Sequence, residues 1–100
     1  MLFRSLTFIF PLVLKAAPKL VFLDLDENHL MDAGAKVLAD AFRVSPVGLT
    51  HFKSSQNYIT SAGAVALIDT IKETTMPLEH LDLSYNTVDS NAMESRPIWG

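Results

Sequence analysis

The chain has 100 residues, of which 49% are hydrophobic and 19% charged, and its formal net charge is −3. This length fits one small domain with a core, and the mildly acidic balance gives no reason to expect nucleic acid or an anionic membrane as partner. The absence of cysteine excludes a disulfide framework, a cysteine zinc site and a thiol nucleophile.

The N-terminal segment contains an apolar run from Leu6 to Leu14 flanked by basic residues. The run is too short to span a bilayer, but it allows two interpretations. In the first, residues 1–17 are a cleaved signal peptide and the protein is secreted. In the second, the run is a helix of the repeat pattern described below. We favour the helix and therefore expect a cytoplasmic protein.

A motif that begins with a leucine and contains an asparagine eight positions later occurs three times, 29 residues apart. The leucines are Leu20, Leu49 and Leu78, and the asparagines are Asn28, Asn57 and Asn86. Each copy starts with the pattern Leu-x-x-Leu-x-Leu, or a variant of it, which is typical of a strand with one buried side. A fixed period of this size predicts a stacked solenoid and not a globule around one closed core.

A helix is predicted after each of the first two strands, because small and apolar residues recur at i, i+3, i+4, i+7 and i+8. The positions are Gly34, Val37, Leu38, Ala41 and Phe42 in one repeat and Gly63, Ala66, Leu67, Thr70 and Ile71 in the next. The early glycine predicts close packing of helix against strand. One period earlier, the same spacing predicts an N-terminal helix that buries Ser5, Phe8, Ile9, Leu12 and Val13. Pro11 argues against that helix, since proline kinks helices.

One period later, the helical spacing fails at Ala92, Ser95, Arg96, Trp99 and Gly100. We therefore expect the third copy to contain a strand and no full helix, followed by an irregular tail. Ile98 and Trp99 would either cover the open end of the array or leave it exposed. An open end predicts marginal stability or self-association, and the chain is also interpretable as a fragment of a longer array.

The motif Leu-x-x-Leu-Asp-Leu-x-x-Asn-x-Leu, followed by Gly-Ala and a helix, resembles leucine-rich repeats. Asp-Ala-Gly-Ala at 32–35 and Ser-Ala-Gly-Ala at 61–64 are similar to the long repeats of ribonuclease inhibitor, Ran GTPase-activating protein and NOD-like receptors. The resemblance covers residues 5–91 and implies an α/β solenoid with parallel β-strands on the concave face and α-helices on the convex face. The single domain would comprise a partial N-terminal repeat (1–19), two repeats (20–48 and 49–77), and an incomplete third repeat with a tail (78–100).

The resemblance also implies a structural role for the three asparagines, which would point inward and bond the backbone of neighbouring loops. Such loops leave amide and carbonyl groups in need of partners. Phe52 and Ser54 depart from the pattern, because leucines are expected at both positions. A buried serine without a partner destabilises a fold by roughly 1–3 kcal/mol, so the middle repeat is predicted to be locally loose.

Alternation along the strands places three columns of side chains on the outer face. These are the ring column (Phe22, His51, His80), the charge column (Asp24, Lys53, Asp82) and the third column (Asp26, Ser55, Ser84). We predict that the nine residues bind a partner protein, with Phe22 as the apolar anchor. The charge column, with Asp26 and Glu27, would form an anionic patch for a basic surface on the partner. The alternating signs of the charge column are equally explained by avoidance of like charges between strands.

Other functions are weaker candidates. His51 and His80 near a carboxylate would allow a zinc or iron site of a metal-dependent hydrolase, although such a flat site lacks supporting residues. Protonation of the two histidines would make a contact sensitive to pH. A GTPase-activating or regulatory role follows from the family resemblance alone. Because the chain shows no nucleophile with a matched base and no phosphate loop, we predict no catalytic residue, resident metal or cofactor.

Overall fold

The computed structural model describes residues 10–88 of the chain. Residues 10–16 are helical. The elements that follow are β1 (Phe22–Asp24), α2 (Met31–Val44), β2 (His51–Lys53), α3 (Ser61–Glu73) and β3 (His80–Asp82). The expectations for residues 1–9 and for the tail from 89 to 100, Ile98 and Trp99 included, lie outside the described residues.

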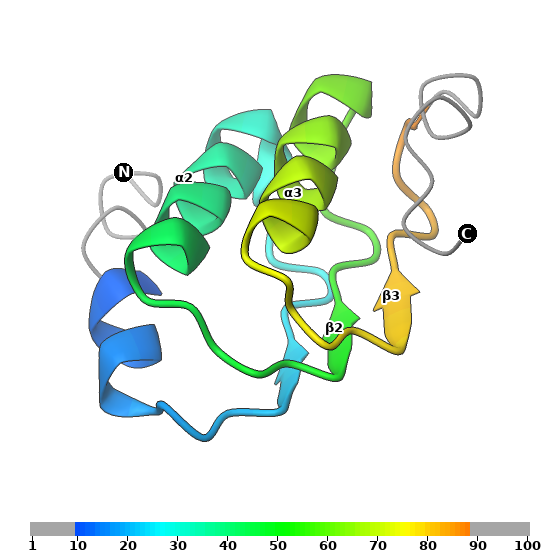
Figure 1. Ribbon diagram of the computed structural model, residues 1–100. Coiled ribbons are helices and arrows are strands. Elements are labelled where there is room, and N and C mark those ends of the chain that lie inside the picture. The colour runs from blue at the N-terminus through cyan, green and yellow to red at the C-terminus, as the bar shows by residue number, and fades with distance from the viewer. Residues whose placement is uncertain (1–9, 89–100) are drawn as a thin grey trace.

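The three strands form one parallel sheet in the order β1-β2-β3, and α2 and α3 lie side by side across one face of it (Figure 1). Phe22 pairs with His51 and His51 pairs with His80, so the strand register equals the sequence period. Parallel neighbours need a crossover connection, and α2 and α3 supply it. The predicted α/β arrangement with parallel strands is thus present in residues 10–88.

The core lies between the sheet and the two helices. Leu38 and Phe42 of α2, Leu67 and Ile71 of α3, and Phe52 of β2 are all at most 1% exposed. The rings of Phe42 and Phe52 meet edge to face, with centroids 5.8 Å apart. Full burial of one such side chain stabilises a fold by roughly 1.5–3 kcal/mol, so this cluster holds the helices on the sheet.

Ser54 is fully buried at a position where leucine was expected. Its hydroxyl accepts a hydrogen bond from Asn57 Nδ2 at 3.1 Å. The unpaired serine on which the prediction of a loose middle repeat depended is therefore absent, and the neighbouring Phe52 fills core volume with a larger side chain.

The N-terminal helix buries a different face from the one predicted. Phe10 and Leu14 are in the core, whereas Leu12 is 66% exposed and Val13 is 43% exposed. Phe10 and Leu14 precede Leu38 and Phe42 by 28 residues, one fewer than the period. The cause is the connection to the next strand region, which takes residues 17–19 here and residues 45–48 after α2. One residue less in the loop rotates the helix by about 100°. In residues 10–88 no helix has the length and hydropathy to cross a membrane.

Gly63 allows a close approach between the starts of the two helices. A Cβ atom at Gly63 would lie 2.5 Å from Asp32 Oδ1, 2.9 Å from Ile59 Cγ2 and 3.1 Å from Ala35 Cβ. Two of these neighbours belong to α2 and none to a strand, so the predicted helix–strand contact is corrected to a contact between successive helices. Asp32 also accepts hydrogen bonds from the backbone amides of Thr60 and Gly63, at 2.7 and 3.1 Å.

Asn57 and Asn86 connect each repeat to the one before it. Asn57 is fully buried; its Oδ1 accepts from the amides of Asn28 (2.8 Å) and Leu30 (3.2 Å), and its Nδ2 donates to the carbonyl of Leu25 (2.8 Å). One period later, Asn86 Oδ1 accepts from the amides of Asn57 (2.9 Å) and Ile59 (3.0 Å). These bonds satisfy backbone groups that leave the sheet and have no strand partner.

Asn28 differs from the inward orientation expected of it. It is exposed, and its Nδ2 donates to Asp26 O, within its own loop, at 3.1 Å. The bonds of Asn57 and Asn86 run to the preceding repeat, and among residues 10–88 no strand precedes β1. The first asparagine therefore has no neighbouring loop to connect in the described part of the chain.

Candidate interaction surface

The ring column lies on the face of the sheet opposite the helices. The centroids of Phe22 and His51 are 5.5 Å apart with an interplanar angle of 20°, and those of His51 and His80 are 4.5 Å apart at 24°. His51 Nδ1 lies 2.8 Å from Thr50 Oγ1 at hydrogen-bond distance, which fixes the plane of the central ring. Phe22, at the end of the stack, is 51% exposed. The column is thus a rigid aromatic ridge with an open end.

The charge column is partly neutralised by its own lysine. Lys53 Nζ lies 3.8 Å from Asp24 Oδ2 and 3.3 Å from Asp26 Oδ2. The hydrogen bond to Asp26 and the charge of Asp24 raise the pKa of Lys53 above its usual value. Two carboxylates share one ammonium group, so the predicted anionic patch is weaker than the count of acidic residues indicates.

Aspartates at the edge of this face form hydrogen bonds to the loops that follow the strands. Asp26 Oδ1 accepts a hydrogen bond from Ser55 N at 2.7 Å. Partial burial alone would raise the pKa of Asp26, but the bonds from Ser55 and the contact with Lys53 hold it below the usual value. Asp82 Oδ1 accepts from Ser84 N at 2.9 Å and Ser84 Oγ at 2.6 Å, which lowers the pKa of Asp82. The three residues of the third column, and Asp82 of the charge column, are therefore already engaged in cross-repeat or local hydrogen bonds.

Within the described residues the metal-dependent hydrolase has no geometric support, whereas the stacked rings of His51 and His80 are close enough for the pH-sensitive contact. Among residues 10–88 no group of three or more histidine, cysteine, aspartate or glutamate side chains is placed to hold a metal ion. Arg43, the arginine of the described part, donates to Glu73 at 2.9 Å and Asp40 at 3.0 Å on the helix layer. The bond to Glu73 raises the pKa of Arg43 and ties α2 to α3, whereas the bond to Asp40 lies within α2.

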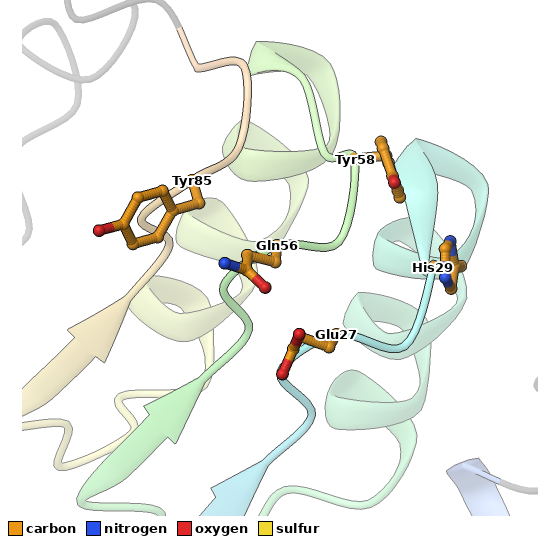
Figure 2. A pocket seen from close by; sticks show the side chains of 5 residues that line it. All are labelled: Glu27, His29, Gln56, Tyr58 and Tyr85. Atoms are coloured by element: carbon orange, nitrogen blue, oxygen red, sulfur yellow. The ribbon is translucent and has the colours of Figure 1, made fainter.

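A recess that the sequence reasoning missed lies where the chain leaves the strands. We call it the loop recess; it has a volume of about 230 Å³ and is lined by Glu27, His29, Gln56, Tyr58 and Tyr85. Figure 2 shows that these side chains project from the loops after β1, β2 and β3, with Glu27 and Gln56 between Tyr85 and the pair formed by His29 and Tyr58. Positions 27, 56 and 85 are one period apart, directly before the asparagines. The period itself was the signal for this fourth column.

All five residues of the loop recess have a left-handed backbone, with φ between 53° and 59°. This region favours glycine and asparagine and is unusual for larger side chains. His29 and Tyr58 stack with their centroids 5.2 Å apart and an interplanar angle of 20°. Tyr58 is 63% exposed and Tyr85 is 81% exposed, so broad ring surfaces face solvent around the recess.

Two segments of the chain, residues 16–39 and 76–95, match the family model described as Leucine Rich repeat. The matches contain the first and third copies of the 29-residue motif and support a leucine-rich repeat protein, and the mixed helix and parallel-strand structure is compatible with that fold. The middle copy, which carries Phe52 and Ser54 in place of leucines, lies outside both segments. No curated protein gives a significant match to the chain.

Proposed function

We propose that this leucine-rich repeat protein is a non-catalytic interaction module or scaffold that binds a partner protein through the outer face of β1, β2 and β3. Leucine-rich repeat domains generally mediate protein–protein interaction, which supports the class of function. The Asp-Ala-Gly-Ala and Ser-Ala-Gly-Ala segments, with the helix contact at Gly63, are our reasons for proposing a ribonuclease-inhibitor-like subtype. A cytoplasmic location is part of the same proposal.

The ring column carries this proposal. Phe22 is 51% exposed although it sits on an ordered strand, and the adjacent Val21 is 52% exposed. The stack on His51 holds the Phe22 ring in place, so little conformational entropy remains to be lost on binding. Rigid exposed aromatic side chains are frequent energetic centres of protein interfaces.

The charges around the ring column favour a partner with basic groups. Asp24 and Asp82 flank Lys53 on neighbouring strands, and Asp24 keeps about half of its side chain exposed. A basic partner surface would add a cation on the open side of these carboxylates. Such rim charges act mainly on the rate of association and on specificity, and less on affinity.

The test uses two exposed apolar positions on opposite layers. A photo-crosslinking amino acid replaces Phe22 in one variant and Val44 of α2 in the other; Val44 is 78% exposed. The protein captured at position 22 is then purified and titrated against the wild type, Phe22→Ala and Val44→Ala. We expect at least tenfold weaker binding for Phe22→Ala and unchanged binding for Val44→Ala.

The proposal is wrong if Phe22→Ala binds the purified partner as tightly as the wild type, or if capture occurs at position 44 and not at position 22. A circular dichroism melt of each variant separates loss of the surface from loss of the fold.

A further inference from the structure

We propose that the loop recess binds an arginine side chain of a partner protein. The recess borders the third column, since residues 27, 56 and 85 directly follow Asp26, Ser55 and Ser84. Its side chains differ from the nine predicted from the sequence, although they lie on the same loops as those of the third column. The inference rests on the proposed protein-binding function in one respect, namely that the arginine belongs to a partner protein.

Glu27 supplies the charge that selects a cation. Its backbone amide donates to the carbonyl of Ser55 at 2.9 Å, which anchors the loop. Among residues 10–88 the Glu27 carboxylate makes no hydrogen bond or ion pair, in contrast to Asp26, which contacts Lys53 and Ser55. A carboxylate that the chain leaves unpaired beside aromatic rings attracts a cationic group from outside.

The rings select a planar cation. The stacked pair of His29 and Tyr58 and the more exposed Tyr85 flank the carboxylate of Glu27 and the amide of Gln56 (Figure 2). A guanidinium group stacks on aromatic faces, is weakly hydrated, and pairs with a carboxylate through two parallel N–H bonds. The side-chain carbonyl of Gln56 is an acceptor for a further N–H. An ammonium group matches the charge but not the planar geometry.

The backbone supports a functional reason for these side chains. The turn needs a left-handed conformation, but it does not need Glu, Gln, His or Tyr there, and glycine would adopt it without strain. A bulky residue in this region costs about 1–3 kcal/mol. Of the seven non-glycine residues with positive φ among residues 10–88, five line this one recess. Strained positions that cluster in this way mark ligand-binding sites in many proteins.

The size of the loop recess also fits a single side chain. Its volume is about 230 Å³, below the range of roughly 300–1,000 Å³ found for sites that enclose drug-sized molecules. It is formed by loops on the surface, where the side chain of a protein partner has access. The occupant that matches its charge, ring faces and size is one guanidinium group.

The experiment is a titration of the full chain with a blocked peptide, acetyl-Gly-Arg-Gly-amide, followed by NMR of the tyrosine and histidine rings. The first control peptide has citrulline, which has nearly the shape of arginine without its charge, and the second has lysine. We expect saturable shifts of Tyr58 and Tyr85 with the arginine peptide, at least fivefold weaker binding of the lysine peptide, and no saturation with citrulline. Raising the salt concentration should weaken the binding.

Glu27→Gln should weaken arginine binding at least tenfold, whereas Glu79→Gln, a matched exposed acid outside the recess, should leave it unchanged. Equal binding of the citrulline peptide, tighter binding of the lysine peptide, or equal effects of the two substitutions would each overturn the proposal. So would saturation without shifts of Tyr58 and Tyr85. The titration needs no partner protein and leaves Phe22 unaltered, so it can fail while the crosslinking test at Phe22 succeeds, and the reverse.

Discussion

The polar residues between the repeats and those of the loop recess occupy similar lattice positions but have opposite bonding. Asn57 is buried, and its side-chain amide bonds to backbone groups of the preceding repeat and to Ser55 O of its own. Glu27 lies one position before Asn28, and its carboxylate has no partner among residues 10–88. A repeated polar position therefore has a structural or a binding role according to whether the chain itself satisfies its hydrogen bonds.

The sharpest test of this comparison replaces Asn57. In Asn57→Ala the amides of Asn28 and Leu30 and the carbonyl of Leu25 lose their partner. The amide of Leu30 is buried and the other two groups are partly buried. A buried group left unpaired costs about 1–3 kcal/mol, so we expect the free energy of unfolding to fall by about 3–5 kcal/mol. Urea denaturation followed by circular dichroism measures it.

Asn28→Ala is the matched control, because Asn28 is exposed and bonds within its own loop. We expect a loss below about 1 kcal/mol. Similar losses for the two variants would show that burial does not separate the two asparagines.

The second-largest loss of stability is expected from a substitution at Gly63, where the two helices meet. Gly63→Ala would place a methyl group against Asp32 Oδ1 and Ile59 Cγ2, and we expect a loss of about 1–3 kcal/mol from overpacking. Gly48→Ala is the control, since a Cβ there meets nothing within 4 Å and its φ is not positive. That change should leave stability unchanged or raise it by about 0.4–1 kcal/mol. Thermal melts of the two variants, monitored by circular dichroism, provide the comparison.

The hydrogen bonds of Asp32 predict how the free energy of unfolding changes as the pH falls. Partial burial would raise its pKa, but hydrogen bonds from Thr60 and Gly63 and the charge of Lys36 lower it in the folded state. The unfolded chain, with a carboxyl pKa near 3.9, therefore takes up the proton first as the pH falls. The stabilisation is complete above about pH 4 and is lost as the pH falls through the folded pKa.

Asp32→Asn tests this sign. We expect a loss of about 1 kcal/mol at neutral pH, because Asp32 accepts the amides at the start of α3 where Thr60 makes no side-chain cap bond. Below about pH 4 the difference in the free energy of unfolding between the variant and the wild type should become smaller. Urea midpoints from pH 2 to pH 7 measure both quantities, and parallel curves for the two proteins would contradict the assignment.

The smallest predicted effect is a gain in stability and not a loss. Gln56 has φ 55° in the loop recess, and Gln56→Gly should raise the free energy of unfolding by about 0.5–1 kcal/mol because glycine relieves the left-handed strain. Ala33→Gly, at an exposed helical position, should lower it by about 1 kcal/mol. Urea denaturation of both proteins tests the claim, and a stability loss in Gln56→Gly would remove the strain argument for the recess.

Sequence reasoning succeeded where the period governs the fold. The 29-residue spacing predicted the strands, the two helices and the residues that lie side by side on the strands, because in-register pairing repeats the same contact. The parallel orientation of the strands was implied by the resemblance to leucine-rich repeats. The division of the chain into repeats at 20, 49 and 78 stays a prediction. The period failed at the N-terminal helix, where a loop one residue shorter places Phe10 and Leu14 in the core.

The candidate site was less predictable for a different physical reason. Alternation identified which strand residues face outward, but it carries no information about hydrogen bonds between neighbours. The bonds of Asp26 to Ser55 and of Asp82 to Ser84 follow from the conformation of the loops. The loop recess depends on left-handed backbone angles at residues such as Glu27 and Tyr85, for which the sequence offers neither glycine nor asparagine as a marker.

The bonds between repeats determine how further repeats could be added to the array. Asn57 reaches back to Asn28 and Leu30, and Asn86 reaches back to Asn57 and Ile59, with equal separations along the chain. A duplicated copy of residues 49–77, inserted after Pro77, would meet on both sides the donors and acceptors it requires. An insertion one residue longer or shorter would break this period, and the difference would have to be absorbed by a loop, as it is in the shorter connection at residues 17–19. Evolution or a protein engineer can therefore lengthen this array in whole modules, and each added module would extend the outer face by one strand.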